Sequence, residues 1–189
     1  MLSLLAALAS QFSFSGALTA QWSDLLIRIN SDLALAQTCT ATACPDTAKR
    51  LLQMAAEAKI SQSPVGITNR LVNMSVTYKQ DWQIYNTPHW ASPLETLEHN
   101  EANCVGQAVL KAAVAILAGV DPQSFRLALV QGEPVGHAVL LHRSASGWTV
   151  LDNNTLLQKP REKYQGIRVE LAFAESNMQK REPPDHPGS

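Results

Sequence analysis

Residues 90–119 read WASPLETLEHNEANCVGQAVLKAAVAILAG, and within them Cys104 stands at the start of an apolar, alanine-rich run. Alanine, leucine and isoleucine recur at helical spacing after Cys104, and Gly119 offers a C-terminal stop, so the run predicts a helix. Cys104 then falls near the helix N-terminus, where unpaired N–H groups and the helix dipole favour a thiolate over a thiol. A lone cysteine there is nevertheless more often small and buried than nucleophilic, so its role depends on the rest of the chain.

The segments around this helix indicate the fold class. Helical patterns come first and strand patterns follow, which predicts an α+β domain whose N-terminal helices pack on an antiparallel sheet. In SPLETL, Ser92 is expected to cap a short helix, with Pro93 at its first position and Glu95 at its third. Further helices are expected at 22–36 and 45–60, a helix or extended segment at 66–81, and strands within 125–132, 136–154 (a hairpin) and 167–175.

The N-terminal residues 1–20, MLSLLAALASQFSFSGALTA, are apolar, small and uncharged, which is typical of a secretory signal peptide. Small residues near the end place the expected cleavage around Ala17 or Ala20. The alternative is an amphipathic N-terminal helix, because no basic residue follows the first methionine. Gln11 and several serines interrupt the run and argue against a membrane-spanning helix. Cleavage would make the protein periplasmic or secreted.

The composition restricts the partners. The chain has 189 residues, 46% hydrophobic and 16% charged, which suits one globular domain with its own core. That domain is expected over residues 21–175, and the polar, proline-rich residues 176–189 are expected to form a disordered tail. The net charge is −1, without a basic stripe or an acidic block, so neither nucleic acid nor anionic lipid is indicated as a partner.

The chain has three cysteines, and two of them are close together. If the protein is exported, Cys39 and Cys44 can close a small disulfide loop and leave Cys104 as a free thiol. The alternative is a pair of reduced cysteines in a cytosolic protein. A zinc site would need more soft ligands at suitable spacing than the sequence contains.

Two further residues give Cys104 a chemical context. His137 opens the strand GHAVLL, and Asp152 ends the partner arm, TVLDNN. Because the arms run antiparallel, both residues come to the same end of the sheet, where Asp152 can accept the second ring N–H of His137. A helix that presents Cys104 to this end completes the nucleophile, base and orienting group of a thiol hydrolase. Each residue also has a structural explanation, as a buried thiol, a half-exposed histidine and a turn aspartate.

The other histidines are weaker candidates for the base. His142 points to the sheet face opposite that of His137 by strand alternation. The remaining histidines are expected at the surface, and they are His89, His99 and His186.

With these residues in place, the chain resembles the bacterial transglutaminase-like cysteine proteinases, which include the LapG-like periplasmic proteases. The resemblance runs from about Leu71 to Asn153, and its most specific part is the Trp-x-Ser-Pro-Leu-Glu block ahead of the cysteine. The matching segments are, in order, VNMSVTYKQD, HWASPLETL, NCVGQAVLKAAVAILAGV, RLALV, GHAVLL and VLDN.

The resemblance implies a papain-like α+β core and peptide hydrolysis through an acyl-enzyme. The family's triad falls on Cys104 as nucleophile, His137 as base and Asp152 as the group that holds it, with the backbone N–H of Cys104 donating to the oxyanion. A near pair of cysteines, here Cys39 and Cys44, is also similar to exported members. The implied substrate is a large bacterial surface adhesin, and the implied regulator is an inner-membrane protein that sequesters the protease.

The chain departs from the family around the nucleophile. LapG-like proteases carry Asp-Cys-Glu-Asp there and bind calcium through the carboxylates, whereas this chain has Asn103, Cys104, Val105 and Gly106. Because Ca²⁺ needs several oxygen ligands, we expect no calcium requirement, no other metal and no cofactor. Gly106 weakens the first helical turn relative to alanine, which suggests the close approach of another backbone.

Two other functions compete with peptide hydrolysis. In acyl transfer, an amine rather than water would resolve the thioester, and neither fold nor triad separates the two reactions. A non-catalytic binding protein on the same fold is suggested by the lost acidic cluster, while the intact triad argues against it.

Overall fold

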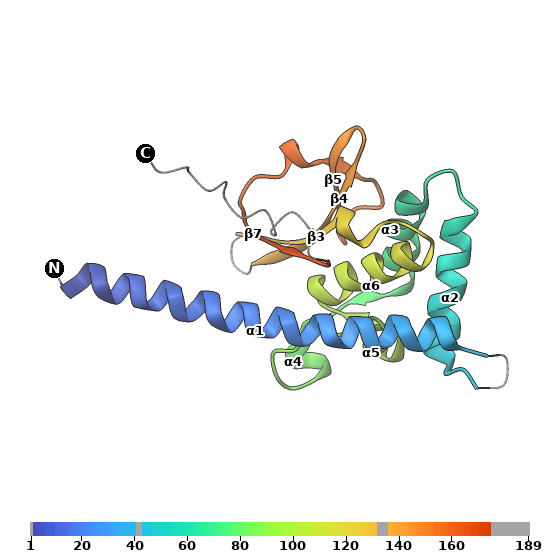
Figure 1. Cartoon of the computed structure of the whole chain (residues 1–189), viewed down its shortest axis with the longest axis horizontal. Helices are drawn as coiled ribbons and strands as arrows, with labels where there is room; N and C mark the ends of the chain where they lie inside the picture. Colours follow the sequence, from blue (N-terminus) through green and yellow to red (C-terminus); the bar gives the residue numbers. More distant parts are fainter. Residues whose placement is uncertain (1, 41–42, 132–135, 175–189) are drawn as a thin grey trace, which may run out of the picture.

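The structure, a computed structural model, describes residues 2–40, 43–131 and 136–174 (Figure 1). Helices precede a five-stranded antiparallel sheet, so the predicted α+β order is confirmed. The helices are α1 (Leu2–Thr38), α2 (Asp46–Lys59), α3 (Pro64–Ser75), α4 (Asp81–Ile84), α5 (Pro93–His99) and α6 (Cys104–Leu117), with 3₁₀ turns η1 (Pro122–Ser124) and η2 (Arg161–Lys163). The strands are β1 (Thr77–Tyr78), β2 (Glu101–Ala102), β3 (Phe125–Val130), β4 (His137–Ser144), β5 (Gly147–Leu151), β6 (Lys159–Pro160) and β7 (Ile167–Ala172).

Helix α6 is the centre of the core and lies between the sheet and the other helices (Figure 1). It is built mainly from alanine, valine and leucine, so it packs closely on both sides. Toward the sheet its buried residues are Ala108, Val109, Ala112 and Ala115, against Leu127, Ala138, Leu140 and Leu151. Toward α2, α3 and α5 they are Leu110, Ala113 and Val114, against Leu51, Val72 and Leu97.

The large sheet has the strand order β6-β5-β4-β3-β7 with antiparallel neighbours. The predicted hairpin is formed by β4 and β5, which pair from Leu140 and Leu151 to Ser144 and Gly147 at the turn. His137, the first residue of β4, therefore lies at the sheet end where β5 finishes. The antiparallel pairing therefore places His137, at the start of β4, beside Asp152, which directly follows β5.

The segment predicted as helical or extended contains both structures in succession. Helix α3 ends at Ser75, and the β-branched Val76 and Thr77 then continue into β1. Strand β1 pairs in parallel with β2, with Tyr78 opposite Ala102. This pairing brings Tyr78 close to the start of α6.

Helix α1 includes the segment predicted as a signal peptide, and its N-terminal end projects away from the remaining elements (Figure 1). Residues 16–21 are largely exposed, whereas Trp22 is 6% exposed and its indole N–H donates to the Ala172 carbonyl on β7 at 3.1 Å. Trp22, which follows the predicted cleavage region, thus packs on the domain, and cleavage itself stays a prediction. Among the described residues, no helix has the length and apolarity needed to cross a membrane. The predicted tail lies outside them.

Candidate active site

Cys104 is the first residue of α6, as the sequence predicts. Asn103 caps the helix: its Oδ1 accepts from the Gly106 N–H at 2.9 Å, and its Nδ2 donates to Asp81 Oδ2 at 2.8 Å. These two bonds fix the orientation of the Asn103 amide. In the first turn of a helix the backbone N–H groups have no carbonyl one turn earlier to bind. The Asn103 side chain satisfies the N–H of Gly106, which leaves the N–H groups of Cys104 and Val105. They are the donors that this helix end offers to an anion.

His137 and Asp152 meet at the end of the sheet. His137 Nε2 lies 2.9 Å from Asp152 Oδ1, and the aspartate is 5% exposed. Burial raises the pKa of Asp152, but hydrogen bonds from His137 and the Asn154 N–H outweigh it and hold that pKa below its ordinary value. An ionised carboxylate only accepts, so Nε2 carries the proton in this pair.

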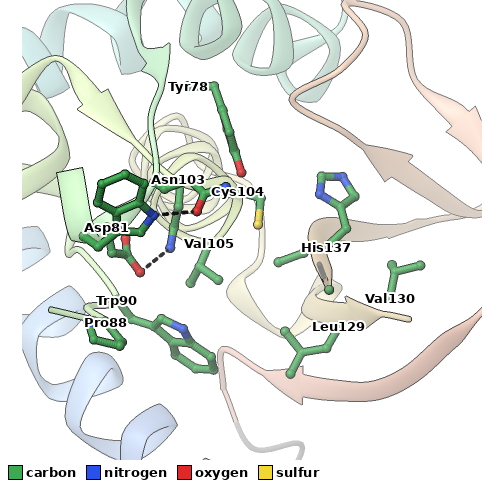
Figure 2. Close-up of a pocket in the computed structure, with 14 residues that line it drawn as sticks. Tyr78, Asp81, Pro88, Trp90, Asn103, Cys104, Val105, Leu129, Val130 and His137 are labelled. Atoms are coloured by element: carbon green, nitrogen blue, oxygen red, sulfur yellow. Dashed lines mark hydrogen bonds between the residues drawn. The ribbon is translucent and has the colours of Figure 1, made fainter. Parts of the chain in front are cut away.

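His137 also interacts with Cys104. Hydrogen bonds to Asp152 and then to Cys104 raise the pKa of His137 to about 9, although burial opposes the shift. Because Asp152 occupies Nε2, Nδ1 is the nitrogen that remains for an interaction with the thiol. Figure 2 shows Cys104 and His137 lining one cavity. A histidine that shares a cavity with a thiol is suited to exchange a proton with it.

Asp152 has support that the sequence did not suggest. The Tyr164 hydroxyl donates to its Oδ2, the Asn154 N–H donates to its Oδ1 at 3.0 Å, and Asn73 Nδ2 donates to its backbone carbonyl at 2.8 Å. Tyr164 comes from the irregular segment between β6 and β7, and Asn73 from α3. No periodicity or motif links either residue to the hairpin.

Lys111 is a second feature that was missed. It is 1% exposed, inside α6, and lies two turns from Cys104 on the same helix face. Burial lowers the pKa of Lys111 to about 7, and the charge of Asp152 opposes that shift. Here a signal existed, because a single lysine within an apolar helix needs a polar or charged partner once it is buried.

The Trp-x-Ser-Pro-Leu-Glu block positions the loop in front of α6. Ser92 and Glu95 form the predicted capping box at the start of α5, and Pro93 is the first residue of the helix. Glu95 Oε2 accepts from the Ser92 N–H at 2.6 Å, from Arg28 Nη1 at 2.8 Å, and lies 3.2 Å from His89 Nε2. Arg28 Nη2 also donates to the Trp90 carbonyl at 2.9 Å. The block therefore ties α1 to the residues that precede the cysteine helix.

The other histidines lie away from the thiol or in structural contacts. His142 stacks on Phe125 with ring centroids 5.1 Å apart, and burial lowers its pKa. His89, predicted at the surface, is partly exposed and lies between Glu95 and Tyr85. His99 is exposed, with its ring edge-on to Tyr85. His186 lies outside the described residues.

The remaining cysteines are joined in a disulfide, with Cys39 and Cys44 sulfurs bonded at 2.08 Å, and Cys104 is a free thiol. The disulfide closes the connection between α1 and α2.

Comparisons with known proteins assign the family. The sequence model of the bacterial transglutaminase-like cysteine proteinases matches residues 33–169, which is most of the chain. The chain belongs to this family.

Solved structures of Legionella pneumophila LapG share the fold with this proteinase. The match has a TM-score of 0.52 at 20% identity and covers 74% of this chain and 80% of LapG. A calcium-bound form of LapG gives the same values, and an EGTA-treated form differs only in coverage, at 78% of LapG. No curated protein sequence matches the chain. Family membership makes the protein a cysteine peptidase that acts on protein substrates, and the core is transglutaminase-like.

The donors around the nucleophile of this proteinase do not fit calcium. Val105 and Gly106 are buried and have no side-chain oxygen, and Asn103 Oδ1 already accepts from the Gly106 N–H. Within the described ranges, no group of three or more His, Cys, Asp and Glu side chains is arranged to hold a metal ion. Calcium prefers several carboxylate and carbonyl oxygens.

Proposed function

We propose that the protein is an exported cysteine peptidase that cuts a protein substrate through a triad of Cys104, His137 and Asp152. The observation that carries this proposal is the position of His137, which binds Asp152 through Nε2 and lines one cavity with Cys104. The nucleophile, the proton carrier and the group that orients the carrier thus form one chain. The family model supports the peptidase class, and the geometry supports this assignment of roles.

In the proposed reaction the Cys104 thiolate attacks the scissile carbonyl, and the N–H of Cys104 donates to the oxyanion. The C–N bond then breaks as Nδ1 of His137 protonates the leaving amine, which leaves a thioester on Cys104. His137, now neutral, takes a proton from water as that water attacks the thioester. The C–S bond then breaks, which releases the acid product and restores the Cys104 thiolate. His137 keeps the proton that it took from water, so it is again an imidazolium.

The proposed substrate is a large adhesin on the bacterial surface, and the proposed site of action is the periplasm or the exterior. Support comes from the family, from the predicted signal peptide and from the Cys39–Cys44 disulfide, a bond that persists in oxidising compartments. An inner-membrane regulator that sequesters the protease is proposed on the same family grounds.

The proposal is tested by cleavage of adhesin segments and generic proteins with wild type, Cys104→Ala and His137→Gln, each with calcium and with chelator. Wild type should cleave in both conditions, because Val105 and Gly106 have no side-chain oxygen and the Asp81 and Asn103 oxygens in the cavity already accept hydrogen bonds. Cys104→Ala should be inactive, and His137→Gln should lose about 10²–10⁴-fold in rate, the usual contribution of a general acid-base group.

His142→Gln is the matched control, since His142 is half-buried against Phe125 and does not line the cavity with Cys104, so its variant should keep cleaving. Iodoacetamide at mildly acidic pH should alkylate Cys104 in wild type and much more slowly in His137→Gln. Absence of cleavage together with a thiol inert below alkaline pH would refute the peptidase and favour a binding protein. Loss of cleavage with chelator alone would refute the metal-free site.

A further inference from the structure

We propose that the cavity in front of Cys104 is the specificity pocket of the enzyme and takes a large, uncharged apolar side chain of the substrate, beside the scissile bond. This inference rests on the proposed function and names the substrate class for the same site. The cavity has a volume of about 340 Å³, and both Cys104 and His137 line it (Figure 2). A side chain one or two residues from the attacked carbonyl would therefore reach it.

The walls of the cavity are mainly hydrophobic. They come from β1 and α4, the loop before α5, the first turn of α6 and the facing ends of β3 and β4. The apolar wall residues are Trp82, Pro88, Trp90, Val105, Leu129, Val130 and Ala138. Each methylene that leaves water in such a place contributes about 0.8 kcal/mol. A volume at the lower end of the range for ligand sites, about 300–1,000 Å³, leaves a glycine or alanine side chain with few contacts.

The pocket is held open by contacts that do not involve the substrate. Trp90 is fixed from behind, because its carbonyl accepts from Arg28 and the neighbouring Ser92 N–H is held by Glu95. Its ring packs against the core cluster beneath the sheet. Leu129 and Val130 are held by the pairing of β3 with β4, in which Val130 lies opposite His137. A preformed pocket spends little binding energy on ordering its walls.

The charge at the cavity argues against ionised side chains. Asp81 is the one carboxylate among the described lining residues, and its Oδ2 already accepts from Asn103 Nδ2 at 2.8 Å and from the His89 N–H at 3.1 Å. An acidic substrate side chain would be repelled by Asp81. A basic one would lose its hydration among apolar walls and gain only a carboxylate that two donors already share. An uncharged apolar side chain meets neither penalty.

The test uses peptidyl vinyl sulfones that differ only in one side chain, set to Gly, Ala, Leu, Phe, Lys or Glu at each of the two positions before the reactive group. The rate of Cys104 modification is followed by intact mass on the full chain. At one of the two positions, Leu and Phe should react at least about tenfold faster than Ala, Lys and Glu, as hydrophobic pockets discriminate by about 10–200-fold for each methylene. Equal rates at both positions, or fastest reaction with Ala, Lys or Glu, would overturn the proposal.

Two pocket variants and one control place the selectivity in this cavity. Trp90→Ala removes a wall and Val130→Phe fills the space, so both should reduce the ratio of the Phe rate to the Gly rate. Trp148→Ala is the matched tryptophan control, since Trp148 lies opposite Arg143 near the β4–β5 turn and does not line the cavity, and the ratio should be retained. An unchanged ratio in Val130→Phe would overturn the proposal even if Trp90→Ala fails to fold. If Cys104 resists both every sulfone and acidic iodoacetamide, the peptidase function itself is refuted, an outcome distinct from a reactive thiol without selectivity.

Discussion

His137 and Lys111 both interact with Asp152, but their protonation has opposite effects on the stability of the fold. The pKa of His137 is raised to about 9, so the folded state keeps a proton that the unfolded chain loses near pH 6.5, and stability is lost as pH rises through this window. The pKa of Lys111 is lowered to about 7, so the unfolded chain keeps a proton that the folded state has released. Stability is then gained as pH rises from about 7 to 10. Between about pH 7 and 9 the two effects offset each other.

Single substitutions should separate the two contributions to the pH dependence of the free energy of unfolding. In a Cys104→Ala background, which removes thiol titration, Lys111→Met should make the free energy of unfolding fall with rising pH, by at most about 1.4 kcal/mol per pH unit. His137→Gln in the same background should make the free energy of unfolding rise between about pH 7 and 9. Urea unfolding at a series of pH values measures both. Parallel pH profiles for the two variants would contradict the assignment of either group.

The sequence predicted those site residues whose place follows from their position in a helix or a strand. A cysteine at a helix start, and a histidine and an aspartate at the same end of a hairpin, are positions that periodicity and antiparallel pairing define. Tyr164 reaches Asp152 from an irregular segment, so its place depends on the path of a loop that no pattern encodes. The burial of Lys111 required knowing that α6 is covered on both sides.

At the scale of elements, the first turn of α6 is fixed by the space around Gly106. A Cβ at this position would lie 2.9 Å from the Ala102 Cβ, 3.1 Å from the Thr96 hydroxyl oxygen and 3.4 Å from the Ala91 Cβ. The sequence suggested the close approach of a backbone, but side chains make the contact, from Ala102 in β2, Thr96 in α5 and Ala91 in the loop before α5. Glycine therefore lets the first turn of α6 pack closely on β2 and α5, which sets the position of Cys104.

Gly106→Ala should lower the free energy of unfolding by about 1–2 kcal/mol, because overpacking outweighs the gain in helix propensity. Gly66→Ala in α3 is the matched control. Its added Cβ would meet only the Ser63 side chain, whose hydroxyl can rotate away, so a gain of up to about 1 kcal/mol is expected. Chemical unfolding at a single pH compares the two. A Gly106→Ala protein as stable as Gly66→Ala would show that α6 and α5 can separate at no cost.

At the scale of the whole molecule, the predicted order of helices before strands gave the correct class because each element carries its own periodicity. The strand order β6-β5-β4-β3-β7 and the parallel pairing of β1 with β2 were not predicted. Both depend on contacts between residues far apart in the chain, and such contacts leave no local pattern. The same holds for Arg28, which links α1 to the loop before α5 across more than sixty residues.

The arrangement of α1 leads to a prediction about the mature protein. Trp22 is buried against the domain and the Cys39–Cys44 disulfide closes the far end of α1, so removal of the first 17 to 20 residues would leave both the Trp22 contact and the disulfide in place. Intact mass of the natively exported protein should show this loss, with one alkylated thiol before reduction and three after it. Cys104→Ala should give none before reduction and two after it, which assigns the free thiol. A chain that retains Met1, or that shows three free thiols after native export, would contradict the periplasmic assignment, because the disulfide and the cleavage both require passage through an exporting, oxidising route.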